Sequence, residues 1–413
     1  MQLKHRTRFT LGIAALAILC AGVAARAENR ADFSLNYFLE PARSQRLHIV
    51  IPQLSANFDV HPMFSINIGY DADIVTGATP RVYGSPADAI SSATTFSDVR
   101  HAPHAGMELR TGPVTLNAGY TFSTEHDYRS HQLNTAAKVD LWGKNTTFLL
   151  GYSHNWDQVC DVDNRGAQPL ERRSLTTSDG CFADTMGLRL EPVTINSYSA
   201  SLSQIFHPIV AGDLTTSFEV VEGFQTNPYR RVRMFGGTVE AQESHPLLRQ
   251  RVAVQARLRI AITKAKASVH ALGRFYWDTW GIKSFTGEVS YQMYVIPQLL
   301  LAVRGRFYQQ GRAVFYRDAG EQNSYETVGP VGQYFTGDRE MSPFRDYLVG
   351  VKLSYLKFAN EKGKIGKVFQ SLDVHLKADV MGYEALTPAP PNLPRSDGFL
   401  DALIAQLGVS LLW

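Results

Sequence analysis

Long segments of alternating apolar and polar residues are the feature that most constrains the fold of this chain. One such segment covers residues 250–262, and others cover 114–122, 346–355 and 367–380. A period of two indicates β-strands, because successive side chains of a strand point to opposite faces. The segments run for about 10 to 14 residues, which exceeds the usual strand of about 5 or 6. A tilted strand that crosses a membrane needs about 9 to 11 residues, so the segments predict membrane-spanning strands.

The sequence contains about sixteen such segments, and they start near residues 32, 46, 63, 104, 114, 132, 145, 194, 213, 249, 266, 281, 298, 345, 367 and 402. Long connections at 77–103, 158–193, 225–247, 310–344 and 382–401 alternate with short ones. We therefore predict an all-β fold, a transmembrane antiparallel up-and-down β-barrel of about 16 strands (roughly 14 to 18) with short periplasmic turns and long extracellular loops. Residues 28–60 fit either the first two strands or an inner plug or periplasmic segment.

The N-terminal residues have the pattern of a secretory signal peptide. A basic start and an apolar stretch over residues 11–24 precede an A-x-A cleavage site that ends at Ala27. We expect residues 1–27 to be removed and residues 28–413 to form a single barrel domain. A retained anchor fits less well, because the apolar stretch is shorter than the roughly 20 residues of a spanning helix.

Composition excludes several other classes of protein. The mean hydropathy is −0.16 and hydrophobic residues make up 44% of the chain, which argues against a bundle of membrane-spanning helices. The net charge of +3 gives no bulk attraction to nucleic acid. An exported chain with this average hydropathy fits a barrel, whose strands alternate lipid-facing and interior-facing residues.

The last eight residues carry a second signal. Gln406 and Gly408 are followed by apolar Leu411 and a final Trp413. This pattern resembles the C-terminal assembly signal of Gram-negative outer-membrane β-barrels. The resemblance implies an integral protein of the outer membrane, in contact with lipid and lipopolysaccharide and recognised by the barrel-assembly machinery.

After cleavage, Cys160 and Cys181 are the remaining cysteines, and both lie in one long external connection. Because the periplasm permits disulfides, we predict a structural bridge between them. A redox or metal site is the alternative, but the C-x-x-C spacing is absent. Acidic residues near Asp161 partly match a calcium loop, although Arg165 occupies a ligand position. We therefore predict no metal site and no cofactor.

Seven stretches resemble an uncharacterised family of predicted outer-membrane proteins, domain of unknown function 3570. They are DAISSA (88–93), STEHDYRS (123–130), KNTT (144–147), GFQTNPYR (223–230), ESHPLLR (243–249), FYWDTWG (275–281) and TGDREMS (336–342). The resemblance implies a barrel. It carries no assigned activity, so no functional residue is transferred from it.

The expected interior of the barrel carries a basic wall. The interior-facing rows between residues 249 and 309 contain the candidate lumen-lining residues Arg251, Arg257, Arg259, Arg274, Arg304, Arg306 and Glu288. Guanidinium groups bind carboxylate and phosphate well, so such a wall favours anionic solutes. We expect the opposing wall to carry Glu108, Asp140, Asp373 and Asp379. In the alternative interpretation, the arginines pair with interior carboxylates and only make the barrel rigid.

Three functions fit the sequence. The first is a porin-like channel for small solutes, with anions favoured by the basic wall, because about sixteen strands usually leave an aqueous interior. The second is a scaffold or conduit for an exported factor or redox partner. The third, an outer-membrane hydrolase, is disfavoured, because the acid and base types in 125–127 are adjacent and point apart. We therefore expect a protein that is not an enzyme, and the sequence leaves its oligomeric state open.

Overall fold

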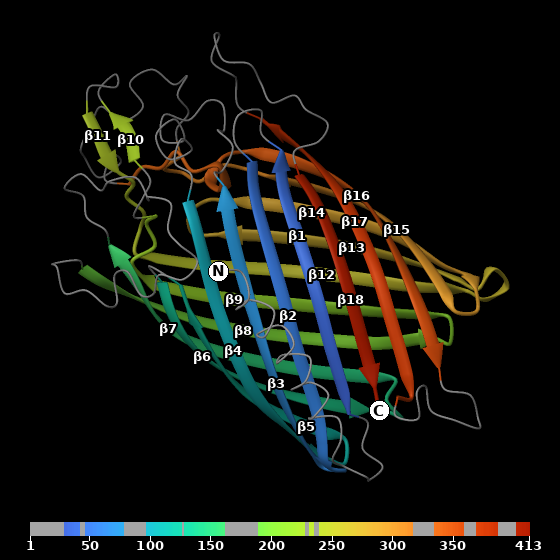
Figure 1. Cartoon of the computed structure of the whole chain (residues 1–413). Coiled ribbons are helices and arrows are strands. Elements are labelled where there is room, and N and C mark those ends of the chain that lie inside the picture. Colours follow the sequence, from blue (N-terminus) through green and yellow to red (C-terminus); the bar gives the residue numbers. More distant parts are fainter. Residues whose placement is uncertain are drawn as a thin grey trace, which may run out of the picture.

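The computed structural model describes residues 29–41, 46–77, 96–125, 128–161, 189–227, 231–234, 239–316, 334–358, 369–386 and 402–413. Sixteen strands form one closed antiparallel barrel (Figure 1). In chain order these are β1 (Arg30–Pro41), β2 (Arg46–His61), β3 (Phe64–Gly77), β4 (Phe96–Thr111), β5 (Val114–Thr124), β6 (Tyr128–Leu141), β7 (Thr146–Asp161), β8 (Arg189–His207), β9 (Val210–Gly223), β12 (Leu248–Ile262), β13 (Ala267–Asp278), β14 (Lys283–Ile296), β15 (Leu299–Gln310), β16 (Phe344–Phe358), β17 (Ser371–Ala385) and β18 (Ala402–Leu412).

Each barrel strand pairs with its neighbours in the chain, which gives the up-and-down topology that the sequence predicts. A further hairpin, β10 (Arg231–Met234) with β11 (Val239–Gln242), belongs to the connection between β9 and β12 and stands apart from the barrel wall (Figure 1). From the sequence, residues 225–247 were expected to form a long connection, and this hairpin was not predicted. Two short 3-10 turns, Thr263–Ala265 and Arg339–Met341, complete the described elements.

The barrel closes where its first strand meets its last. β1 pairs with β18 over ten residue pairs, from Arg30 opposite Leu412 to Leu39 opposite Leu403, and the two strands lie side by side in Figure 1. The backbone N–H of Trp413 donates to the carbonyl of Asn29 at 3.0 Å, and the reverse bond measures 3.1 Å. Residues 30–41 and 46–61 are therefore barrel strands, which resolves the question that the sequence left open.

The C-terminal residues predicted as an assembly signal lie at this closure. Gln406 and Gly408 belong to β18 on its interior-facing row, and a Cβ at position 408 would collide with the ring of His375. Trp413 lies on the opposite, outward face, where its ring packs edge-on against Phe58 at 6.2 Å between centroids. Their role in assembly stays a prediction.

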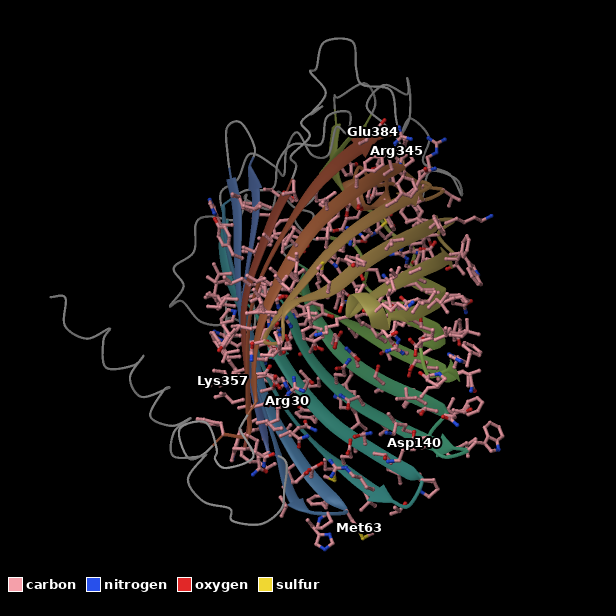
Figure 2. All side chains as sticks on the ribbon, turned by 90° about the vertical axis from the view of Figure 1, so that its right-hand side faces the viewer. Arg30, Met63, Asp140, Arg345, Lys357 and Glu384 are labelled. Atoms are coloured by element: carbon pink, nitrogen blue, oxygen red, sulfur yellow. The ribbon has the colours of Figure 1, made fainter. Side chains whose placement is uncertain are left out.

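The two ends of the barrel differ. Short connections join β2 to β3, β4 to β5, β6 to β7, β8 to β9, β12 to β13 and β14 to β15 at one end, here called the turn end. The long connections lie at the opposite end, here called the loop end. Met63 marks the turn end, and Arg345 with Glu384 marks the loop end (Figure 2).

The outward face of the wall is apolar. Large side chains on the outward rows expose much of their surface, including Leu150 at 61%, Val349 at 60% and Leu376 at 59%. Aromatic residues end these rows, as with Trp156 and Phe275 toward the loop end and Tyr355 toward the turn end. A continuous apolar exterior of this kind is typical of a surface that contacts something other than water.

Among the described residues, no helix is long and apolar enough to cross a membrane.

The predicted signal peptide, residues 1–27, lies outside the described residues.

Candidate functional site

The interior wall formed by β12 to β17 carries the predicted lumen-lining side chains. Arg251, Arg257 and Arg259 alternate with the outward row of β12, because the strand period is two. Arg274 on β13, Glu288 on β14, and Arg304 and Arg306 on β15 occupy the same face of their strands. The register places Glu288 directly opposite Arg306.

Most of these arginines have carboxylate partners on the neighbouring strand or, for Arg304 on β15 and Asp379 on β17, on the next strand but one. Each of four pairs joins one interior arginine to one acid: Arg251 to Glu219 at 2.7 Å, Arg259 to Asp213 at 2.7 Å, Arg306 to Asp346 at 3.0 Å and Arg304 to Asp379 at 2.6 Å. The pairs cross from strand to strand and so brace the wall. For these four arginines, the geometry corresponds to the alternative interpretation, in which the arginines pair with interior carboxylates and make the barrel rigid.

Asp379 is the centre of the tightest group. Its side chain is fully buried, and Arg304 binds both of its oxygens, at 3.1 Å through Nε and at 2.6 Å through Nη2. Lys377 adds a third contact at 3.0 Å. A Cβ on Gly350 would collide with this carboxylate, so the pair requires glycine at that position.

The position of Asp379 corrects one expectation. The sequence predicts this acid, together with Asp373 of the same strand β17, on the wall opposite the arginines. Three strands lie between β12 and β16 in the barrel order, and β17 follows directly. Asp379 therefore belongs to the basic wall itself. The error arose because sequence alone gives the face of a residue but not its position around the barrel.

A hollow of about 320 Å³ lies in this wall. Its charged lining consists of four cations and two carboxylates: Arg257, Arg304, Lys352 and Lys377 with Glu288 and Asp379. Arg304 and Lys377 contact Asp379, and Arg304 also lies 3.6 Å from Glu288. The two acids are thus balanced by two of the cations.

Arg257 and Lys352 are the remaining cations of the hollow. Neither has a carboxylate within ion-pair distance, and the same holds for Arg274 above them, over the part of the chain that the structure describes. The hollow therefore carries two uncompensated positive charges. Lys352 and Lys377 were absent from the predicted set, although both lie on the polar rows of the alternating segments at 346–355 and 367–380.

Outer connections at the loop end form a compact cluster, here called the cap. Its buried core consists of Trp280, Ile282, Ala313, Phe315, Tyr316 and Met341. The cluster packs on the interior-facing Tyr276 of β13. Arg249 of β12 lies 4.1 Å above the Trp280 ring and binds Asp278 at 2.5 Å. The cap is therefore fixed to the interior side of β12 and β13.

A polar group inside the cap joins two further connections. Glu243 accepts hydrogen bonds from the Thr336 hydroxyl and the Gly337 N–H, both at 3.0 Å. His245 lies 3.5 Å from the other oxygen of Glu243. Acid, histidine and hydroxyl thus meet, but Glu243, His245 and Thr336 are all buried. Their hydrogen bonds join the connection before β12 to the one before β16, so the group stabilises these loops.

The cap brings together four of the seven stretches singled out in the sequence. The described residues 223–227 of the first stretch, with 243–249, 275–281 and 336–342, all contribute to it, although they span more than a hundred positions. The sequence alone does not predict that these stretches meet, because the alternation of residues along the strands contains no information on contacts between loops.

Several predicted features lie partly or wholly outside the described residues. Cys160 is fully buried at the loop end of β7, but Cys181 is not described, so their bridge stays a prediction. Residues 126–127 and 162–165 are likewise not described. Within the described ranges, no three His, Cys, Asp or Glu side chains converge as a metal site.

The family described as "Protein of unknown function (DUF3570)" matches residues 83–369. No curated protein matches the chain significantly. Solved structures with a similar fold include the outer membrane protein OpdK from Pseudomonas aeruginosa, which is 11% identical over 95% of this chain and 100% of that chain, with a TM-score of 0.41. A bacterial polysaccharide outer membrane secretin is also 11% identical, over 95% of this chain and 100% of that chain, with a TM-score of 0.46.

Proposed function

The chain belongs to the DUF3570 family, and we propose that it is an outer-membrane channel for small anionic solutes. In this proposal the apolar outward rows contact lipid, the turn end faces the periplasm and the loop end faces the outside of a Gram-negative cell. Short periplasmic turns and long external loops are the rule for such barrels.

The membrane placement is supported by the contrast between the two faces of the wall. The outward row of β16 runs Tyr347, Val349, Val351 and Leu353, all at least 40% exposed. The interior row of the same strand carries Asp346 and Lys352. In water, the exposed apolar rows would drive association, whereas in a bilayer they match the hydrocarbon.

The anion preference rests on one observation, the two uncompensated cations of the interior hollow. Arg257 and Lys352 face the barrel interior without carboxylate partners in the described structure, while the neighbouring acids are balanced by Arg304 and Lys377. Charged rings and walls set the ion selectivity of channels. A solute with a carboxylate or phosphate group would find a guanidinium and an ammonium group at one site.

Single-channel recording on the refolded protein in planar bilayers tests this function. We expect discrete conductance steps and a reversal potential in a salt gradient that corresponds to anion preference. Heat-modifiable mobility on gels verifies that the barrel is folded. A folded barrel without conductance would refute the channel, and a cation preference would refute the assignment of solute class.

A second function, that of a conduit or scaffold for an exported factor or redox partner, draws support from the cap. The cap occupies the interior side of β12 and β13 at the loop end, where a partner would enter or leave. Co-purification of a second protein after mild detergent extraction, lost in a Trp280→Ala variant, would favour this function. Extraction of the barrel alone, with conductance, would favour the channel.

A further inference from the structure

Three hydrogen bonds of the same geometry join neighbouring strands near the loop end. In each, a tyrosine hydroxyl contacts Nδ1 of a histidine on the next strand: Tyr37 with His48 at 2.7 Å, Tyr70 with His101 at 2.6 Å and Tyr120 with His131 at 2.6 Å. Each histidine lies two positions before the residue directly opposite the tyrosine. The diagonal pairing thus recurs three times, on β1–β2, β3–β4 and β5–β6.

A related arrangement continues the series on β7. Tyr152 and His154 share the amide oxygen of Asn196, at 3.0 and 2.8 Å. His131 stacks on Trp156 at 6.3 Å between ring centroids. We call the four tyrosines and four histidines the Tyr–His belt: Tyr37, Tyr70, Tyr120, Tyr152, His48, His101, His131 and His154.

The belt faces outward, away from the barrel interior. Tyr70 and Tyr120 continue the exposed apolar rows of β3 and β5 and are 39% and 42% exposed. On the outward row of β6, His131 lies closer to the loop end than Leu133. On the outward row of β4, His101 lies closer to the loop end than Met107 and Leu109. The belt therefore lies where the apolar rows approach the loop end. On β12 to β18, the described outward positions contain no histidine.

The hydrogen bonds determine which histidine atom is available. A phenol O–H that donates to Nδ1 requires a neutral imidazole with its proton on Nε2. No described residue accepts a hydrogen bond from Nε2 of His48, His101 or His131. In that tautomer, the three tyrosines orient three Nε2–H donors along one side of the barrel.

The outward rows that carry the belt contain positive but no negative side chains among the described residues. By strand parity, the described outward positions of β1 to β7 contain no aspartate or glutamate, because Asp71, Asp73, Asp140 and Asp157 all occupy interior rows. Arg129 lies next to His131 on the outward row of β6, on its loop-end side. The belt is therefore rich in donors and lacks carboxylates that would repel an anion.

We propose that the Tyr–His belt binds the phosphate groups of lipid headgroups in the leaflet at the loop end. The acyl chains of such a lipid lie on the apolar rows, and its phosphate oxygens accept hydrogen bonds from Nε2 of His48, His101 and His131. Phosphate oxygens are strong acceptors, and hydrogen bonds to charged groups are stronger than neutral ones. The inference rests on the proposed membrane placement and is independent of what the interior conducts.

The test compares two lipids with identical acyl chains. Folded barrel in neutral detergent is titrated with diphosphoryl lipid A and with the same lipid after removal of its phosphates, and binding is measured by native mass spectrometry. We expect roughly tenfold tighter binding of the phosphorylated form, as hydrogen bonds to charged groups would give. The His48→Phe, His101→Phe, His131→Phe triple variant replaces each imidazole by an aromatic ring without hydrogen-bonding atoms, and it should lose most of this preference.

Controls separate the belt from general effects. The His61→Phe, His207→Phe variant changes two histidines at the turn end and should keep the wild-type preference. Tyr70→Phe with Tyr120→Phe should weaken the preference, because Nδ1 of His101 and His131 is then released. Equal binding of both lipids by the wild type, an unchanged preference in the triple variant, or displacement of the lipid by inorganic phosphate would overturn the proposal. A barrel that conducts without lipid preference refutes only the belt, and one that prefers the phosphorylated lipid without conducting refutes only the channel.

Discussion

Reversing the charge of Lys352 should abolish the anion preference of the barrel. Lys352 is one of two uncompensated cations in the interior hollow, the other being Arg257. An ion that passes about 7 Å from a unit charge in water interacts with it by roughly 0.6 kcal/mol. In 0.1 M salt, where the Debye length is about 10 Å, screening lowers this interaction to roughly 0.3 kcal/mol.

Two such charges favour anions and disfavour cations by roughly 0.6 kcal/mol each, which corresponds to an anion-to-cation permeability ratio of about 7. Lys352→Glu leaves a net charge near zero in the hollow and should bring the ratio close to 1. Adding Arg257→Glu should invert the ratio to about 7 in favour of cations. Reversal potentials in a tenfold gradient around 0.1 M salt measure the ratio, and the effect should shrink in 1 M salt.

Lys357→Glu is the matched control for this prediction. Lys357 lies on the same strand, β16, with an exposed side chain on the opposite face near the turn end (Figure 2). The substitution changes the net charge of the protein by the same amount as Lys352→Glu. A reversal potential that shifts equally in both variants, or in neither, would refute the assignment of selectivity to the hollow.

Two further substitutions test the construction of the wall. Gly350→Ala should displace Asp379 from Arg304 and lower the free energy of unfolding by roughly 3 kcal/mol, because a buried charge loses its partner; the urea midpoint should fall accordingly. Gly305→Ala is the control, since its added Cβ meets no atom within 4 Å, and it should unfold like the wild type. Equal urea midpoints for both variants would contradict this reasoning. Trp413→Ala should lower the yield of heat-modifiable barrel, because the final aromatic side chain is lost from the closure. Trp142→Ala, a substitution in an exposed turn, should leave the yield unchanged. A normal yield from Trp413→Ala would count against the C-terminal assembly signal.

The residues that line the interior wall could be predicted from the sequence, because the alternation within each strand shows which residues share a face. Period two over residues 250–262 placed Arg257 on the interior side without knowledge of any partner. The number of strands followed in the same way, and the predicted starts lie within a few residues of the observed ones except at β4, which begins at Phe96, and at β8, which begins at Arg189.

Contacts between distant segments could not be predicted. The pairing of Arg304 with Asp379 joins residues 75 positions apart, and its existence depends on the strand order and on the shear of the barrel. The cap depends on which long loops fold toward each other, and the alternation of residues contains no information on that. The Tyr–His belt was missed for a related reason, because each tyrosine and histidine occupies an ordinary position on its own strand.

The closure of β1 against β18 imposes an order on biogenesis. Asp32 and Ser410, which form a hydrogen bond across this closure, are 378 residues apart. One edge of β1 therefore stays unpaired until β18 is available. Long-range pairing of this kind is intrinsically slow and leaves edges open to aggregation. Because β18 pairs with both β1 and β17, a chain truncated within β18 would lose the closure of the whole barrel rather than a single strand.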